Sequence, residues 1–177
     1  MILSGSVLTL LLFLKIPVIM KRVVLSILVF LSAVLTLKGT SVTSRDRVVV
    51  AYVTSWSSVI PDPFVMTHVN YAFGHVSDSF DGVRIDNPER LKMLVDLKKV
   101  NPELKVMLSI GGWGSGRFSE MAADKKLRRS FAADCRRTVE QFGLDGIDID
   151  WEYPTSSAAN ISSSENDTRN FTRLMKD

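Results

Sequence analysis

Acidic and apolar side chains alternate over a short stretch in the last quarter of this 177-residue chain. Asp148, Asp150 and Glu152 occupy every second position, separated by Ile149 and Trp151. Successive side chains of a β-strand point to opposite faces, so the three acids share one face at steps of about 6.6 Å. The apolar residues point the other way, where we expect them to pack under helices. This row of carboxyl groups is a candidate centre for acid–base chemistry.

The three carboxyl groups cannot all ionise at low cost, because like charges and desolvation both favour the protonated form. A carboxyl group that keeps its proton near neutral pH can act as a general acid. Glu152 is the last of the three and lies nearest the rim where parallel α/β barrels place their sites, so we assign it as the proton donor. Asp150 would orient or stabilise the reacting group, and Asp148 would tune Asp150. Asp145 has the opposite parity and lies where the strand begins, which leaves its role open.

Two further interpretations of the acids remain open. One is a solvated acidic edge strand, although such strands seldom combine isoleucines on one face with three acids on the other. The second is a Mg²⁺ or Ca²⁺ site, since these cations prefer carboxylate oxygens. Sites of that kind usually draw ligands from several segments of the chain.

The elements that must position the acids are indicated by hydrophobic patterning. Four segments are predicted strands: 47–56, 68–76, 105–110 and 144–151. Helical spacing and end signals predict three helices: one that begins at Asn87, one from about 124 to 142, and one over 165–177. Strands that alternate with helices indicate an α/β fold with a parallel sheet. The acids lie where a buried strand should be apolar, and such departures tend to mark functional sites.

Two motifs in this order resemble those of glycoside hydrolase family 18, the chitinase family. Residues 145–154, DGIDIDWEYP, match the family signature Asp-x-x-Asp-x-Asp-x-Glu, and residues 109–113, SIGGW, resemble its Ser-x-Gly-Gly motif. Residues 71–73, YAF, and Tyr52 on the first strand are also typical. The resemblance covers about residues 46–177, and two motifs on the expected strands make it specific.

The resemblance implies a (β/α)₈ TIM barrel that cleaves β-1,4 links between N-acetylglucosamine units without a metal or an organic cofactor. Glu152 would protonate the glycosidic oxygen while the N-acetyl carbonyl of the substrate acts as nucleophile, which is a substrate-assisted retaining mechanism. Asp150 would hold the acetamido N–H and stabilise the oxazolinium-like intermediate. With Asp148 these are the implied catalytic residues; the implied supporting residues are Asp145, Ser109 and Tyr52, and the implied sugar-binding residues are Phe73, Trp113 and Gly112.

A complete barrel of this class has eight strands and typically about 250 residues. The four predicted strands account for the first four βα units, so we expect residues 45–177 to be the N-terminal half of a truncated barrel. The family places a tyrosine near the acetamido group and a tryptophan under the sugar on later strands. We therefore expect the fragment to be inactive by itself.

Three classes of function compete. A chitinase is favoured, with an endo-β-N-acetylglucosaminidase acting on glycans as a near variant. A chitinase-like carbohydrate-binding protein is the second class, but such relatives usually lack the final acid, which is present here as Glu152. The third is the cation-binding domain described above. In each case except the third, the expected partner is chitin or another oligosaccharide that contains N-acetylglucosamine.

The positive charge of the chain is confined to its beginning. The net charge is +3, but residues 1–44 carry four basic and no acidic side chains, which leaves residues 45–177 at −1. The paired arginines of the helix at 124–142 are expected to form a solvated face rather than a nucleic-acid site. A nucleic-acid partner is therefore not expected, and the oligomeric state is not predicted.

Residues 1–44 have the pattern of a leader. Two apolar runs, 2–14 and 23–37, are each shorter than the roughly 20 residues of a spanning helix. The segment from Met20 has the basic start, apolar core and polar end of a secretory signal, and residues 1–19 would be an upstream over-extension. An uncleaved anchor is the alternative. We expect a secreted, periplasmic or cell-surface protein that has no membrane contact once the leader is removed.

Three asparagines, Asn160, Asn166 and Asn170, begin Asn-x-Ser/Thr sequons. They lie in a Ser/Thr-rich stretch, where such sequons also arise by chance. They matter only if the chain enters a eukaryotic secretory pathway.

Overall fold

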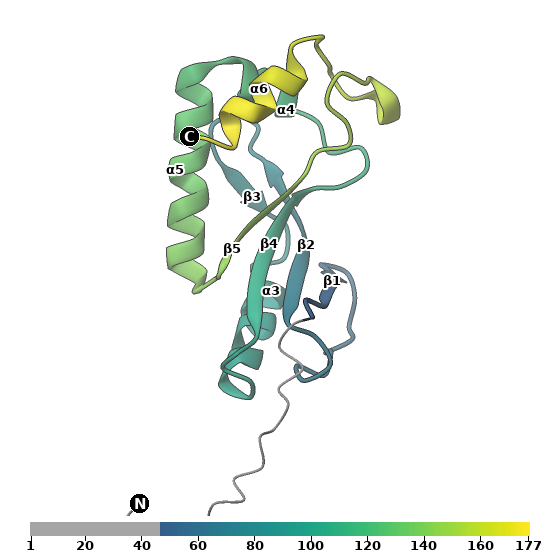
Figure 1. Ribbon diagram of the computed structural model, residues 1–177, viewed down its shortest axis with the longest axis vertical. Helices are drawn as coiled ribbons and strands as arrows, with labels where there is room; N and C mark the ends of the chain where they lie inside the picture. Colours follow the sequence, from purple (N-terminus) through teal and green to yellow (C-terminus); the bar gives the residue numbers. More distant parts are fainter. Residues whose placement is uncertain (1–46) are drawn as a thin grey trace, which may run out of the picture. The chain divides into compact units, whose positions relative to one another are not determined.

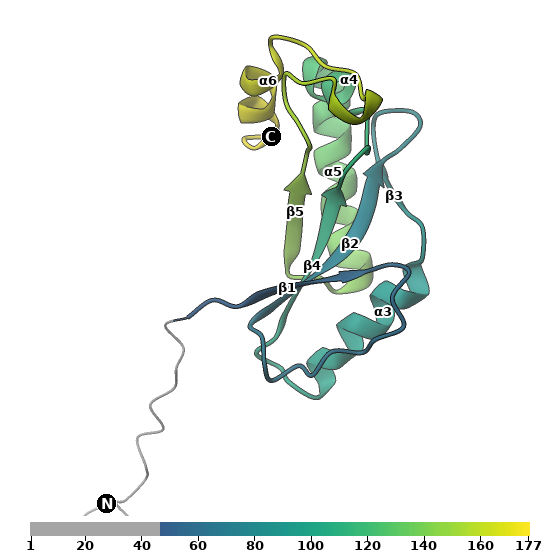
Figure 2. The same ribbon diagram turned by 90° about the vertical axis from the view of Figure 1, so that its right-hand side faces the viewer.

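The computed structural model describes residues 47–177, and the predicted leader lies outside the described residues. A sheet of four parallel strands organises this part of the chain, and the strands are added side by side in chain order. In Figure 2 the arrowheads of the last three point to the same end of the sheet. The four strands are β1 (Val50–Thr54), β2 (His68–Val76), β4 (Lys105–Gly111) and β5 (Gly146–Asp150).

Alternation in the two central strands separates a helix-covered face from a polar face. Val69, Tyr71, Val106 and Leu108 are fully buried and belong to one hydrophobic core, which also contains apolar side chains of the helices. Residues of the opposite parity include Asn70 and Ser109, which face away from that core. Figure 2 shows α5 lying behind the strands, on the apolar side. The polar face is therefore free to carry chemistry.

The helix α3 (Pro88–Asp96) begins as the sequence predicts. The side chain of Asn87 accepts a hydrogen bond from the backbone N–H of Arg90, and proline occupies the first helical position. The chain tightens into the 3₁₀ helix η1 (Leu97–Lys99) before it reaches β4. The helix α3 packs on β2 through its buried leucines.

The predicted helix over 124–142 is confirmed as α5 (Lys125–Phe142). The carboxylate of Asp124 caps its start by accepting hydrogen bonds from the N–H groups of Lys126 and Leu127 at 2.7 and 2.9 Å. Its C-terminal cap is Gly143, with φ +71°. The structure thus confirms the predicted start near residue 124 and the predicted end at residue 142. In Figure 1 α5 runs along one side of the sheet.

Three short elements were not predicted. They are the strand β3 (Val83–Ile85), which pairs antiparallel with the end of β2, the helix α4 (Phe118–Ala123) and the 3₁₀ helix η2 (Ala158–Asn160). Segments of three to six residues are too short to show a hydrophobic period. They form because their surroundings supply partners, as the end of β2 does for β3.

Three predicted elements are shorter in the structure. The first strand is confined to Val50–Thr54, the fourth to Gly146–Asp150, and the last helix, α6, to Asp167–Leu174. No helix is present in the described connection 55–67 between β1 and β2. Within residues 47–177, no helix is both long and apolar enough to cross a membrane.

The apolar face of the acid-bearing strand packs as expected. Trp151 is buried and stacks on Phe118 of α4, with ring centroids 5.3 Å apart and planes at 14°. Its edge meets Phe171 of α6 at 6.0 Å and 85°. Because side chains alternate, this anchor under α4 and α6 turns the neighbouring acids toward the polar face.

Candidate active site

The carboxylate of Asp148 joins all four parallel strands. Its Oδ2 atom accepts hydrogen bonds from the hydroxyl of Tyr52 on β1 at 2.8 Å and from the amide of Asn70 on β2 at 3.2 Å. The hydroxyl of Ser109 on β4 donates to the same oxygen at 2.8 Å. The strand register pairs Tyr52 with Asn70 and Ser109 with Asp148, which explains the convergence. The structure brings together three of the predicted site residues in this cluster.

Sequence reasoning missed Asn70. Its side chain is only 5% exposed, and a buried amide needs a hydrogen-bond partner, which Asp148 provides. The available signal was a lone amide between Val69 and Tyr71, two residues of the hydrophobic core. Three donors aimed at one oxygen hold the Asp148 carboxylate in a single orientation.

Removing a buried donor from this cluster should cost more than removing an exposed one. Ser109 is fully buried, whereas Tyr52 is 54% exposed and its partner can be solvated when the hydroxyl is absent. We expect Ser109→Ala to lower the free energy of unfolding by about 1.5–3 kcal/mol, the usual range for a hydrogen bond to a charged group. We expect Tyr52→Phe to lower it by less than about 1 kcal/mol. Urea unfolding of both variants checks this, and equal costs would contradict it.

Asp150 and Glu152 form the second part of the site. Burial raises the pKa of Asp150 above its ordinary value, and the charges of Glu152 and Asp148 and a hydrogen bond with Glu152 act in the same direction. The raised pKa therefore falls on Asp150, whereas the residue pattern assigned the retained proton to Glu152. Glu152 lies two residues beyond the end of β5.

The raised pKa of Asp150 makes stability depend on pH. The folded state binds more protons than the unfolded state between the ordinary pKa and the raised one, so stability falls as pH rises through that window. Asp150→Asn removes the ionisation, and we expect this variant to gain stability relative to the parent at pH 7. The gain should shrink as the pH is lowered toward 4. Thermal unfolding at both pH values measures it, and a variant less stable than the parent at pH 7 would refute the expectation.

Asp145 is not brought together with the other acids. It directly precedes β5, at the opposite end of the strand from Glu152, and its carboxylate lies 2.8 Å from the Lys98 ammonium and 3.4 Å from that of Lys105. It also accepts a hydrogen bond from the N–H of Val106 at 2.8 Å. Partial burial alone would raise the pKa of Asp145, but these partners outweigh it and hold the pKa below the ordinary value. The contacts tie the start of β5 to β4 and η1, which is a structural position rather than one beside the carboxylates.

Two glycines let the β4 end approach its neighbours closely. Gly111 has φ +134°, and a Cβ there would lie 1.9 Å from the backbone oxygen of Asp150. Gly112 donates its N–H to that same oxygen at 2.9 Å, and a Cβ on it would lie 2.8 Å from the ring of Phe73. The glycines thus provide backbone room beside Asp150.

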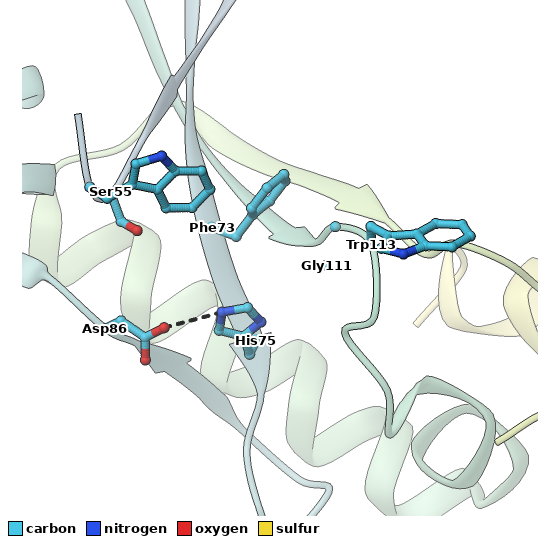
Figure 3. A pocket seen from close by; sticks show the side chains of 8 residues that line it. Ser55, Phe73, His75, Asp86, Gly111 and Trp113 are labelled. Atoms are coloured by element: carbon cyan, nitrogen blue, oxygen red, sulfur yellow. Dashed lines mark ion pairs between the residues drawn. The ribbon is translucent and has the colours of Figure 1, made fainter. Parts of the chain in front are cut away.

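A cavity of about 300 Å³ opens beside these glycines, and Figure 3 shows it. The three residues predicted to bind sugar line this cavity, together with several residues that the sequence did not single out. Trp113 is 66% exposed, and the edge of its ring system meets Tyr153 at 6.1 Å. The lining residues are Ser55, Trp56, Phe73, His75, Asp86, Gly111, Gly112 and Trp113.

His75 connects two loops at the side of this cavity. Its Nε2 lies 3.3 Å from the Asp86 carboxylate, drawn as a dashed line in Figure 3, and its Nδ1 lies 2.9 Å from the Ser115 hydroxyl. Burial lowers the pKa of His75, although Asp86 opposes the shift. The loop after β4, which carries Trp113, is thereby held to the loop after β3. No local sequence signal predicted this cluster, since its members are 11 to 40 residues apart.

The geometry gives the cation-binding interpretation no support. Among residues 47–177, no three His, Cys, Asp or Glu side chains converge as a metal site requires. The single thiol is also an unsuitable ligand, because burial raises the pKa of Cys135 to about 12.

The model of the family described as "Glycosyl hydrolases family 18" matches residues 48–177. This chain belongs to that family. It is 33% identical over 155 residues to "Probable chitinase 2" of Drosophila melanogaster, an alignment that covers 75% of this chain and 31% of the relative. The family is one of chitinase-type glycoside hydrolases, and its two signature motifs lie where the acids and glycines meet.

Solved structures of chitinases show the same fold. The chitinase domain of the spore coat protein CotE from Clostridium difficile superposes with a TM-score of 0.70 at 38% identity, covering 73% of this chain and 37% of the other. The group IV chitinase of Ostrinia furnacalis in complex with allosamidin has a TM-score of 0.67 at 30% identity, covering 74% and 39%. The chain thus spans about a third of the length of these relatives. Its four parallel strands are the first four of a (β/α)₈ barrel, which confirms the predicted fold class.

Proposed function

We propose that this chain provides the acid-bearing half of a site that cleaves β-1,4-linked N-acetylglucosamine polymers. The observation that carries the proposal is the Asp148 carboxylate, held by Tyr52, Asn70 and Ser109 in the same row as Asp150 and Glu152. Burial raises the pKa of Asp150, and Glu152 follows at the end of the strand. Exposed aromatic rings beside it offer flat apolar faces to a sugar.

The proposed chemistry begins with the transfer of a proton from Glu152. Glu152 donates it to the glycosidic oxygen as the bond to the anomeric carbon breaks, and the N-acetyl oxygen of the same sugar attacks that carbon. Asp150 then accepts a hydrogen bond from the acetamido N–H, and its carboxylate stabilises the positive charge of the oxazolinium-like ring. Water opens the ring, and Glu152 recovers the proton. Two displacements at the anomeric carbon retain its configuration.

We also propose that the chain is secreted through the leader at residues 1–44, and that residues 47–177 do not turn over substrate by themselves. β1 and β5 are the outer strands of the parallel sheet, so no further strand of residues 47–177 borders the polar face beyond them. Barrel enzymes draw catalytic residues from the ends of several strands around the whole ring. A half ring holds the acids without the remainder of the sugar site.

The experiment compares the chain with a completed barrel. Residues 47–177 are joined to the second half of the catalytic domain of the C. difficile relative, and both proteins are assayed for release of reducing ends from chitin oligosaccharides. We expect turnover by the fusion and none by the 177-residue chain. Hydrolysis by the chain alone would contradict its proposed inactivity. A folded fusion that binds oligosaccharide without turnover would favour the carbohydrate-binding alternative.

A further inference from the structure

The asparagines of this chain fall into two groups. The three that begin Asn-x-Ser/Thr sequons all lie in the segment that follows β5, and the sequence ranks them alike as acceptors of N-linked oligosaccharide. The structure separates them by burial. Asparagines elsewhere in the chain do not begin a sequon; they are Asn70, Asn87 and Asn101.

The segment is held in one conformation by a buried carboxylate. Asp167 is fully buried and accepts hydrogen bonds from the hydroxyl of Ser119 on α4 at 2.7 Å and from the N–H groups of Thr155 and Ser164 at 3.2 and 2.7 Å. These contacts tie both ends of the loop to α4. Ile161, 7% exposed, anchors the middle of the loop in the core.

These anchors leave two of the asparagines on the outside. Asn160 precedes Ile161 and is exposed, with φ +58°, a left-handed conformation that asparagine tolerates. Asn166 precedes Asp167, is exposed, and makes no capping hydrogen bond to α6. In each case the inward residue is the neighbour, so the asparagine amide is available to a modifying enzyme.

Asn170 is placed differently. It lies on the buried face of α6 with Asp167 and Leu174, and only 5% of it is exposed. Its side-chain oxygen accepts a hydrogen bond from Arg173 at 3.3 Å. An oligosaccharide on this amide would have to pass through packed protein, so the folded unit cannot accommodate it.

We propose that Asn160 and Asn166 carry N-linked oligosaccharides after passage through a eukaryotic secretory pathway, and that Asn170 does not. This rests on the proposed secretion of the chain. The donor is a lipid pyrophosphate-linked oligosaccharide: the asparagine amide nitrogen forms a bond to the sugar C1, the C1–O bond to pyrophosphate breaks, the amide loses a proton, and the lipid pyrophosphate leaves. Figure 2 shows this loop at the end of the sheet toward which β4 and β5 point, so both sugars would stand on the side of the molecule that bears the active-site acids.

Translation of the full chain with endoplasmic-reticulum microsomes tests the proposal. Protease protection reports entry, and an upward gel shift that peptide-N-glycosidase reverses reports the sugar. We expect two steps for the parent, one for Asn160→Gln and for Asn166→Gln, and none for the double variant. Asn170→Gln is the matched control and should retain both steps. Mass spectrometry of the released protein should show conversion to aspartate at positions 160 and 166.

Substitutions at the hydroxyl positions separate loss of the sequon from loss of the asparagine. Ser162→Ala and Thr168→Ala keep both asparagines, and each should lose one step, whereas Ser162→Thr should lose none. A protected chain without a shift would overturn the glycosylation and leave secretion intact. An unprotected chain would overturn both proposals. Modification at Asn170 would overturn the ranking by burial.

Discussion

Glu152→Gln in the completed barrel is expected to lower kcat by about 10²–10⁴-fold, the usual contribution of a general acid. Glutamine keeps the size of the side chain and can still form hydrogen bonds, but it has no acidic proton to transfer to the glycosidic oxygen. Binding of a chitin oligosaccharide should change little, because the aromatic faces and the Asp148 cluster are untouched. Steady-state hydrolysis and calorimetric binding measure the two quantities.

The matched control for this variant is Glu165→Gln. Glu165 is exposed and lies in the loop after β5, so the same chemical change there should leave kcat unaltered. If Glu152→Gln retained a tenth or more of the parental kcat, Glu152 would not be the proton donor. A parallel loss of binding would instead indicate that Glu152 maintains the shape of the site.

Gly111→Ala should have the largest effect on stability, with a loss of about 3–5 kcal/mol in the free energy of unfolding. The residue has φ +134°, in a region that is essentially restricted to glycine. The added Cβ would also lie 1.9 Å from the backbone oxygen of Asp150, which is backbone and cannot rotate away. Moving that oxygen would break its 2.9 Å hydrogen bond with the N–H of Gly112 and displace Asp150.

Gly114→Ala distinguishes crowding from backbone strain. Gly114 has φ +80°, but a Cβ there would meet no atom within 4 Å. We expect only the cost of a left-handed alanine, about 1–2 kcal/mol. Urea unfolding of both variants gives the comparison. Equal losses would show that β4 does not approach β5 as closely as the structure has it.

The acid-bearing strand shows which structural features a local residue pattern can predict. Alternation is a property of consecutive residues, so the common face of Asp148 and Asp150 and the burial of Trp151 could be predicted without a fold. The same holds for the caps of α5, because a capping side chain bonds to backbone two or three residues away. Strong family motifs then located Tyr52 and Ser109 near the acids.

Contacts across strands needed the tertiary structure, because register and burial depend on residues that are distant in the chain. Only the pairing of β1, β2, β4 and β5 directs Asn70 to the same oxygen as Ser109. The lysine partners of Asp145 likewise come from other segments of the chain. The raised pKa of Asp150 depends on local burial and on neighbouring charges, which a residue pattern does not measure. The identity of the acids, their order and their common face were determined by the sequence itself. Their hydrogen-bond partners, the distances to those partners and the ranking of the three sequons were determined by packing.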